Sequence, residues 1–183
     1  WCHDKNMGIY LGTNFCMAGL WNPMLKNVFM RRRPYFDHPQ IQCLKPVHHG
    51  ADIYDIHIQG FSFPSGHSSN AATVYGSIAR FSQKRVVTAA AVVITLLVGC
   101  SRFCLGVHYP TDVLCGWLLG IFAIFFVPWL KGKFQKKWAF YLVLILLSLP
   151  GCLYCKTTDY FSALGMSIGF FAGNLLEENY VRF

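Results

Sequence analysis

Residues 113–130, VLCGWLLGIFAIFFVPWL, form an 18-residue stretch without a charged side chain. A helix rises about 1.5 Å per residue, so this stretch nearly matches a bilayer hydrocarbon core of about 30 Å. We therefore predict that it forms a helix that crosses a membrane.

The composition predicts a membrane environment for the whole chain. Hydrophobic residues make up 54% of its 183 residues and charged residues only 13%, whereas soluble domains carry about 25% charged residues. This balance excludes a disordered or fibrous protein. The 16 Lys and Arg exceed the 8 Asp and Glu, but they lie between apolar runs and do not form one basic face, so we expect no nucleic-acid partner. Membrane lipids are the expected partners.

Five further segments resemble the first in length or apolar character. Residues 138–155 are also uncharged, and the others are residues 7–25, 68–83, 86–100 and 160–176. We predict an all-α, polytopic transmembrane helical bundle of about six spans. Residues 1–183 are expected to form one membrane-embedded domain, with a motif-bearing core at about 7–130 and two further helices at 138–155 and 160–176.

Small and polar side chains predict how the spans pack. Asn14 and Asn22 lie in an uncharged segment and indicate a helix that is enclosed by other helices. Gly165, Gly169 and Gly173 recur at a spacing of four. Either they let another helix approach closely, or they are simply tolerated in lipid.

The connecting loops predict the orientation, because short loops rich in Lys and Arg usually stay in the cytoplasm. Two such loops are KGKFQKK at 131–137 and QKR at 83–85. If both loops lie in the cytoplasm, the alternate loops lie outside the cell. These are residues 31–64, 101–112 and 156–159. Arg31, Arg32 and Arg33 then lie outside against the charge rule, and binding of an anion would explain them.

Three polar clusters interrupt the apolar sequence, and the topology places all of them at the outer ends of helices. They are Lys26 with Arg33 and Pro34, then Pro64-Ser65-Gly66-His67, then Ser101-Arg102 with His108 and Asp112. Lys26 offers a point charge, and Arg33 and Arg102 offer planar groups that bind two phosphate oxygens. Ser65 and Gly66 precede a helix whose first N–H groups lack internal partners. Together these groups would neutralise a transferring phosphoryl group.

The two histidines suit the remaining chemistry. His108 lies four residues before Asp112 and Pro110 suits a first helical turn, so the carboxylate can reach one imidazole nitrogen. The other nitrogen is then free to act as nucleophile, and the carboxylate stabilises the imidazolium that develops. His67 would serve as the general acid for the leaving oxygen.

The three clusters resemble the signature of the type-2 phosphatidic acid phosphatase superfamily, which reads KxxxxxxRP, PSGH and SRxxxxxHxxxD. Here the blocks are KNVFMRRRP at 26–34, PSGH at 64–67 and SRFCLGVHYPTD at 101–112, all without a gap. Family members carry one or two helices before the helix of the first block. Because this chain opens with Trp1 near that helix, we expect its N-terminus to be truncated.

The resemblance implies a metal-independent phosphomonoesterase or diphosphatase that needs no cofactor. It assigns the nucleophile to His108, the orienting acid to Asp112 and the general acid to His67. Its phosphate ligands would be Lys26, Arg33, Ser65, Gly66 and Arg102.

We therefore expect a multi-pass integral membrane hydrolase of the bacterial cytoplasmic membrane, with its active site facing outward. The substrate would be a lipid phosphate or diphosphate of the phosphatidic acid, phosphatidylglycerophosphate or polyprenyl diphosphate class, cleaved through a phosphohistidine intermediate. A headgroup at the interface can reach such a pocket while its tail stays in hydrocarbon. A lipid phosphotransferase with the same phosphoenzyme and a catalytically silent membrane scaffold are the alternatives. The sequence indicates no oligomeric state.

The segment at residues 35–63 is long for a connection. It contains side chains that could ligate zinc or manganese, namely His48, His49, Asp52, Asp55 and His57. No companion motif demands a metal, so we predict no metal site and expect the loop to cover the phosphate site or contact the headgroup. Arg31 and Arg32 either add positive charge around the phosphate or attract anionic lipids.

Overall fold

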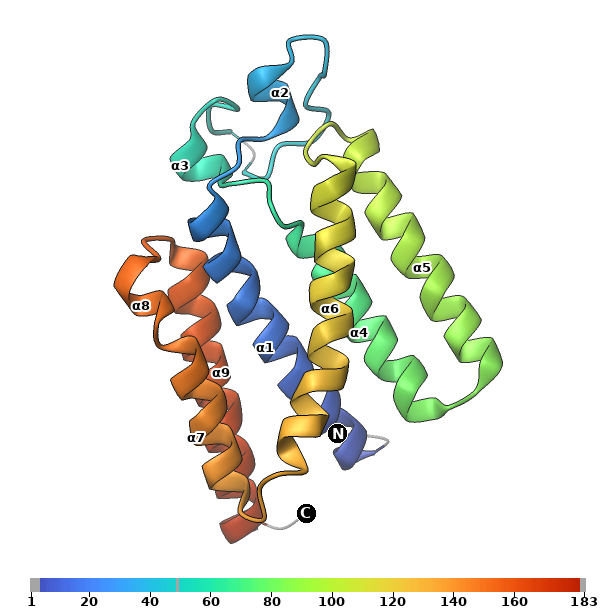
Figure 1. Cartoon of the computed structure of the whole chain (residues 1–183), viewed down its shortest axis with the longest axis vertical. Helices are drawn as coiled ribbons and strands as arrows, with labels where there is room; N and C mark the ends of the chain where they lie inside the picture. The colour runs from blue at the N-terminus through green and yellow to red at the C-terminus, as the bar shows by residue number, and fades with distance from the viewer. Residues whose placement is uncertain (1–3, 49, 182–183) are drawn as a thin grey trace.

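The regular elements are helices throughout the described part of the chain. The computed structural model describes residues 4–48 and 50–181. In chain order its elements are α1 (Lys5–Phe29), α2 (Pro34–Asp37), α3 (Ile56–Gln59), α4 (Gly66–Ser82), α5 (Arg85–Cys104), α6 (Pro110–Lys131), α7 (Lys137–Ser148), α8 (Gly151–Tyr154), α9 (Thr158–Leu176) and the π-helix η1 (Glu177–Val181). The long helices form a bundle whose loops lie at two opposite ends (Figure 1). The predicted all-α bundle is thus confirmed.

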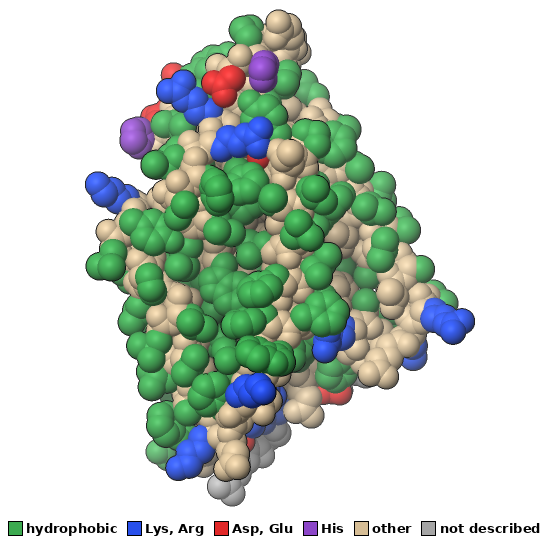
Figure 2. All heavy atoms as spheres, in the orientation of Figure 1, with side chains coloured by type: hydrophobic (Ala, Val, Ile, Leu, Met, Phe, Trp, Pro, Cys, Tyr) green, Lys and Arg blue, Asp and Glu red, His purple; other side chains and the backbone are tan. Residues whose placement is uncertain are grey.

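The surface between the two ends is apolar. On the face shown in Figure 2, hydrophobic side chains cover the middle of the molecule and most charged side chains lie toward its ends. Helix α5 exposes Val93 and Leu97, and α6 exposes Leu118 and Phe122. An apolar surface of this extent is expected against lipid and not against water.

Three segments are long and apolar enough to cross a membrane: Arg85–Cys104, Pro110–Lys131 and Lys137–Tyr154. The predicted spans 7–25, 68–83 and 160–176 are also helical, as α1, α4 and α9. They do not meet the same criterion of length and composition, so the predicted count of six spans is not confirmed.

The predicted helix at residues 138–155 is interrupted. Helix α7 ends at Ser148, and α8 begins only after Pro150. A proline has no N–H to donate and its ring crowds the preceding turn, so a continuous helix is disfavoured there. The buried Tyr160 of α9 donates its hydroxyl to the Ser148 carbonyl at 2.6 Å. The predicted span is therefore present at Lys137–Tyr154 but is broken after Ser148, and α9 satisfies a carbonyl at the break.

Buried amides join α1 to α4. The Nδ2 atom of Asn14 donates to Ser77 Oγ at 3.0 Å, and that of Asn22 donates to Ser69 Oγ at 3.3 Å and to the Pro64 carbonyl at 3.4 Å. These bonds confirm that α1 packs among other helices. The bond to Pro64 also ties α1 to the turn that begins α4.

Helices α4 and α6 share the most extensive contact in the bundle. Two glycines of α6 permit it. A Cβ atom at Gly116 would lie 2.6 Å from the Ser65 carbonyl oxygen, and one at Gly120 would lie 2.7 Å from the Ser69 carbonyl oxygen. Only glycine allows backbones to approach this closely. This pair sets the spacing between the helix starts that carry His67 and Asp112, and the sequence analysis did not identify it.

The glycine stripe of α9 has a different environment. A Cβ atom at Gly165, Gly169 or Gly173 would meet no atom of the described residues within 4 Å. Within the described chain, these glycines therefore pack against no helix, as the second of the two interpretations stated.

We predict that Gly116→Ala destabilises the bundle by about 1–3 kcal/mol, because the added methyl group overpacks a backbone contact. Thermal unfolding of the detergent-solubilised protein, followed by size-exclusion fluorescence, measures the effect. Gly169→Ala adds the same group to open space and is the matched control. Equal melting temperatures for the two variants would contradict the assigned contact.

Candidate active site

The candidate site lies where four long helices begin or end at one end of the bundle (Figure 1). Lys26 is in the last turn of α1, and Arg102 is in the last turn of α5. His67 is in the first turn of α4, and Asp112 is in the first turn of α6. Arg33 is the residue before α2. The three polar clusters, far apart in sequence, thus share one end of the fold.

Arg33 is buried, with 3% of its surface exposed. Its Nε and Nη2 atoms donate to the Gln59 carbonyl at 3.1 and 2.8 Å, and Nε also approaches the Gly60 carbonyl at 3.1 Å. Nη1 donates to the Val107 carbonyl at 3.1 Å. A guanidinium group has five N–H donors, so two are left over for an anion.

The other two predicted cations also contact neutral oxygens. Lys26 Nζ donates to the Phe61 carbonyl at 3.0 Å. Arg102 donates from Nε and Nη2 to the Ser101 hydroxyl at 3.0 and 2.9 Å. No carboxylate of the described residues forms an ion pair with any of these three cations. Their positive charge is therefore available to an anionic ligand.

The turn before α4 is held by α6. The Ser65 N–H donates to the Asp112 carbonyl at 2.9 Å, and the Ser65 hydroxyl caps α4 by accepting from the Ser68 N–H at 3.4 Å. A Cβ atom at Gly66 would meet only Asn22, at ordinary contact distance. Packing therefore does not require glycine at position 66, and its open side suits the close approach of an oxyanion.

His67 is exposed and lies just before the predicted span 68–83. Partial burial, followed by the positive charges of Arg102 and Lys26, lowers the pKa of its imidazole. Cations of the first and third motifs thus both act electrostatically on the histidine of the second. A bound phosphate would oppose this effect and favour the protonated imidazole.

His108 and Asp112 form the predicted pair. The Nδ1 atom of His108 lies 3.5 Å from Asp112 Oδ2, and both side chains are almost fully buried. This distance is too long for a strong hydrogen bond, and Nδ1 has no other partner among the described residues. Burial, joined by the positive charges of Arg33 and Lys26, lowers the pKa of His108 to about 4, although Asp112 opposes the shift. The imidazole is therefore neutral near pH 7, as a nucleophile must be.

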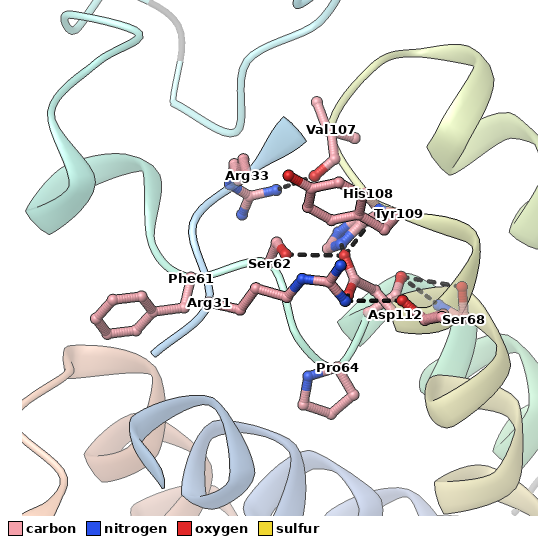
Figure 3. A network of polar contacts seen from close by, with 12 residues as sticks. Arg31, Arg33, Phe61, Ser62, Pro64, Ser68, Val107, His108, Tyr109 and Asp112 are labelled. Carbon is pink, nitrogen blue, oxygen red and sulfur yellow. Dashed lines mark hydrogen bonds and ion pairs between the residues drawn. The ribbon is translucent and has the colours of Figure 1, made fainter. Parts of the chain in front are cut away.

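The Asp112 carboxylate has three further donors (Figure 3). Oδ2 accepts from the Tyr109 N–H at 2.8 Å, which closes a capping box at the start of α6, and from Ser62 Oγ at 2.8 Å. Oδ1 accepts from Arg31 Nη1 at 3.0 Å. The sequence analysis did not identify Ser62, and it gave Arg31 no role toward Asp112. The Arg31–Arg33 run was a signal, but its partner was not predictable from spacing.

The long loop at residues 35–63 contacts the third motif. The Leu44 N–H donates to the Leu105 carbonyl at 3.1 Å. Gly106 has φ of +74°, and a Cβ atom there would overlap the Gln42 carbonyl, so the contact requires glycine. The buried Gln59 side chain bonds the backbone of the same loop, accepting from the His48 N–H at 3.2 Å.

Two of the loop's candidate metal ligands, Asp52 and Asp55, are engaged in local structure. Asp52 accepts from the Tyr54 N–H at 2.9 Å, and Asp55 caps α3 through the His57 N–H at 2.9 Å. No group of three or more His, Cys, Asp or Glu side chains is placed to hold a metal ion within residues 4–48 and 50–181. His49, another of the candidate ligands, lies outside the described residues.

Known proteins resemble part of this chain. The sequence profile of the PAP2 superfamily matches residues 7–136. Phosphatidylglycerophosphatase B of Bacillus subtilis (strain 168) is 46% identical over 90 residues, which cover 44% of this chain and 44% of that protein. Undecaprenyl-diphosphatase BcrC of the same strain is 33% identical over 106 residues, which cover 58% of this chain and 48% of that protein.

A solved structure is also similar. It is the crystal structure of a transmembrane PAP2 type phosphatidylglycerolphosphate phosphatase from Bacillus subtilis, with 38% sequence identity and a TM-score of 0.50. The match covers 71% of this chain and 59% of that one. The chain spans about half the length of the curated relatives that it matches. The transmembrane neighbour and the apolar helices identify an integral membrane protein.

We predict that Asp112→Asn lowers the pKa of His108 further, because the neutral amide no longer stabilises the imidazolium. Nitrogen NMR of the histidine-labelled protein in detergent measures this titration. The folded protein should keep His108 neutral above about pH 4. A wild-type midpoint near the usual histidine value of about 6.5 would contradict the assigned burial.

Proposed function

This chain belongs to the PAP2 superfamily, and we propose that it is an integral membrane phosphatase that hydrolyses a lipid phosphate or lipid diphosphate. One observation carries the proposal. The buried His108–Asp112 pair lies at the same end of the bundle as Lys26, Arg33 and Arg102, so a neutral nucleophile and a cationic anion site occur together.

We propose that the phosphate group binds among the three cations. Lys26 contributes a point charge, and Arg33 and Arg102 contribute the N–H groups that their carbonyl and hydroxyl partners leave unused. The start of α4 adds the Gly66 N–H and the Ser65 hydroxyl as donors for an anion at the helix N-terminus, whereas the Ser65 N–H already donates to the Asp112 carbonyl. These donors stabilise the negative charge on the oxygens of the transferring group.

The reaction then proceeds through His108. Its Nδ1 carries the proton and faces Asp112, so the lone pair on Nε2 attacks phosphorus and the bond to the leaving oxygen breaks. His67 gives its proton to that oxygen. His67 next removes a proton from water, whose oxygen attacks the phosphohistidine, and cleavage of the P–N bond restores His108. Asp112 stabilises the imidazolium during the first step. This chemistry needs no metal ion and no cofactor.

The substrate class is supported by the position of the site. The cationic cluster lies at the ends of helices whose middle parts are apolar, so a lipid headgroup at the interface would reach it while the tail stays in hydrocarbon. The names of the relatives, a phosphatidylglycerophosphatase and an undecaprenyl-diphosphatase, fit phosphatidylglycerophosphate and polyprenyl diphosphate, and phosphatidic acid has the same phosphate chemistry.

We propose that the site faces the extracytoplasmic side. The loop that joins α4 to α5 contains Lys84, and the loop that joins α6 to α7 contains Lys133 and Lys136. Both lie at the end of the bundle opposite the motifs (Figure 1). Lys-rich short loops usually stay in the cytoplasm, which leaves the motif end outside and favours six crossings in total. A bacterial cytoplasmic membrane suits this arrangement.

His108→Ala should abolish phosphate release, with a fall of about 10⁴-fold or more, because no other group can form the phosphoenzyme. The assay measures free phosphate from a panel of lipid phosphates and prenyl diphosphates, with full-length protein in detergent. His57→Ala removes an exposed loop histidine and is the matched control. Full activity of His108→Ala would refute the mechanism. Recovery of the phosphate on a lipid acceptor in place of water would identify a phosphotransferase.

His67→Ala should slow the reaction in a way that depends on the leaving group. Esters with a poor alkoxide leaving group should lose about 10²–10⁴-fold, because they need a proton in the transition state. Nitrophenyl phosphate, whose leaving group is already acidic, should lose much less. Initial rates with both substrates measure the difference. Equal losses for the two would exclude the acid role of His67.

A further inference from the structure

Arg31 and Ser62 are not fixed positions of the family signature, yet they connect its three blocks through Asp112. Arg31 lies in the loop after α1 and donates from Nη1 to Asp112 Oδ1 at 3.0 Å. Ser62 precedes the second block and donates from Oγ to Asp112 Oδ2 at 2.8 Å. The Ser62 N–H also donates to the Arg31 carbonyl at 2.8 Å. The three bonds form a closed ring, of which Figure 3 shows the two side-chain bonds to Asp112.

Arg31 is itself held in place by α6. The same Nη1 atom donates to Thr111 Oγ1 at 2.7 Å. The guanidinium carbon lies 3.9 Å from the centre of the Tyr109 ring, which is within the range of a cation–π contact. Thr111 and Tyr109 belong to the same helix start as Asp112. Arg31 therefore connects the first motif loop to the third at a defined position.

The carboxylate needs such a restraint. The terminal torsion of an aspartate is broad, so its plane can rotate at little cost. Oδ2 lies 3.5 Å from His108 Nδ1 and already accepts from the Tyr109 N–H. One bond to Oδ2 does not define the plane of the group, whereas a donor on each oxygen does.

We propose that Arg31 and Ser62 are positioning residues that hold the Asp112 carboxylate in the plane that presents Oδ2 to His108. This inference rests on the proposed function. In the sequence analysis, Arg31 either added positive charge around the phosphate or attracted anionic lipids. The role proposed here differs from both. The neighbouring Arg32 is exposed and makes no hydrogen bond or ion pair with the described residues.

The test compares Arg31→Gln with Arg32→Gln, which removes the same charge one position away. We expect Arg31→Gln to lower kcat by about 10- to 100-fold, because a misplaced Asp112 carboxylate no longer orients the nucleophile His108 for attack. KM should stay unchanged, and Arg32→Gln should behave as the wild type. Ser62→Ala should also lower kcat, and the double variant should lose less than the product of the two single losses, because both residues hold one carboxylate.

A second measurement does not depend on turnover. The nitrogen NMR shifts of His108 report which ring nitrogen carries the proton. The wild type should hold it on Nδ1, and Arg31→Gln and Ser62→Ala should each shift population toward the Nε2–H tautomer. Arg31→Lys should recover part of the wild-type state, since an ammonium group can bond Oδ1 but lacks the planar fork.

Three outcomes would overturn the inference. One is a raised KM with unchanged kcat in Arg31→Gln, which would mean that Arg31 contacts the substrate. Another is equal behaviour of Arg31→Gln and Arg32→Gln. The third is an unchanged His108 tautomer in both Arg31→Gln and Ser62→Ala. If the wild type cleaves no lipid phosphate, the proposed function fails, and the tautomer measurement still decides the positioning role.

Discussion

The Asp112 carboxylate at the start of α6 is the group on which the site depends. It is fully buried, and burial of an unpaired carboxylate is costly. The structure offsets this cost with hydrogen bonds from three separate segments: its own helix start, the loop after α1 and the segment before α4. The Asp112 carbonyl also accepts from the Ser65 N–H. One residue therefore aligns loops that are far apart in the sequence.

The bundle supplies the rigid frame for this arrangement. Gly116 and Gly120 let α6 approach the α4 backbone, and Asn22 ties α1 to the same turn. The frame brings Lys26, Arg33 and Arg102 together without an ion-pair partner among the described residues, which costs electrostatic energy in the absence of a ligand. Carbonyl oxygens around Arg33 and Lys26 compensate part of it. A site that is stable while cationic suits the capture of a phosphate headgroup.

Much of the fold was predictable from local patterns. Long apolar runs predict helices because every backbone N–H and C=O must be paired in lipid, and a helix pairs them internally. The start of α4 after Ser65 and the start of α6 at Pro110 were predictable from capping and proline preferences. The break after Ser148 was missed although Pro150 was visible, because hydropathy alone favoured one span. The role of the Gly116–Gly120 pair was missed because close packing depends on the partner helix.

The sequence by itself determined the helical class, the order of the helices and the set of candidate site residues, since these follow from composition and from short-range spacing. The placement of Arg31 and Ser62 on Asp112 was decided by the tertiary structure. Contacts between residues 31, 62 and 112 depend on how three helices pack, and no local periodicity specifies that packing. For the same reason, the sequence could not show that Gly165, Gly169 and Gly173 face open space. This depends on how α9 packs in the bundle.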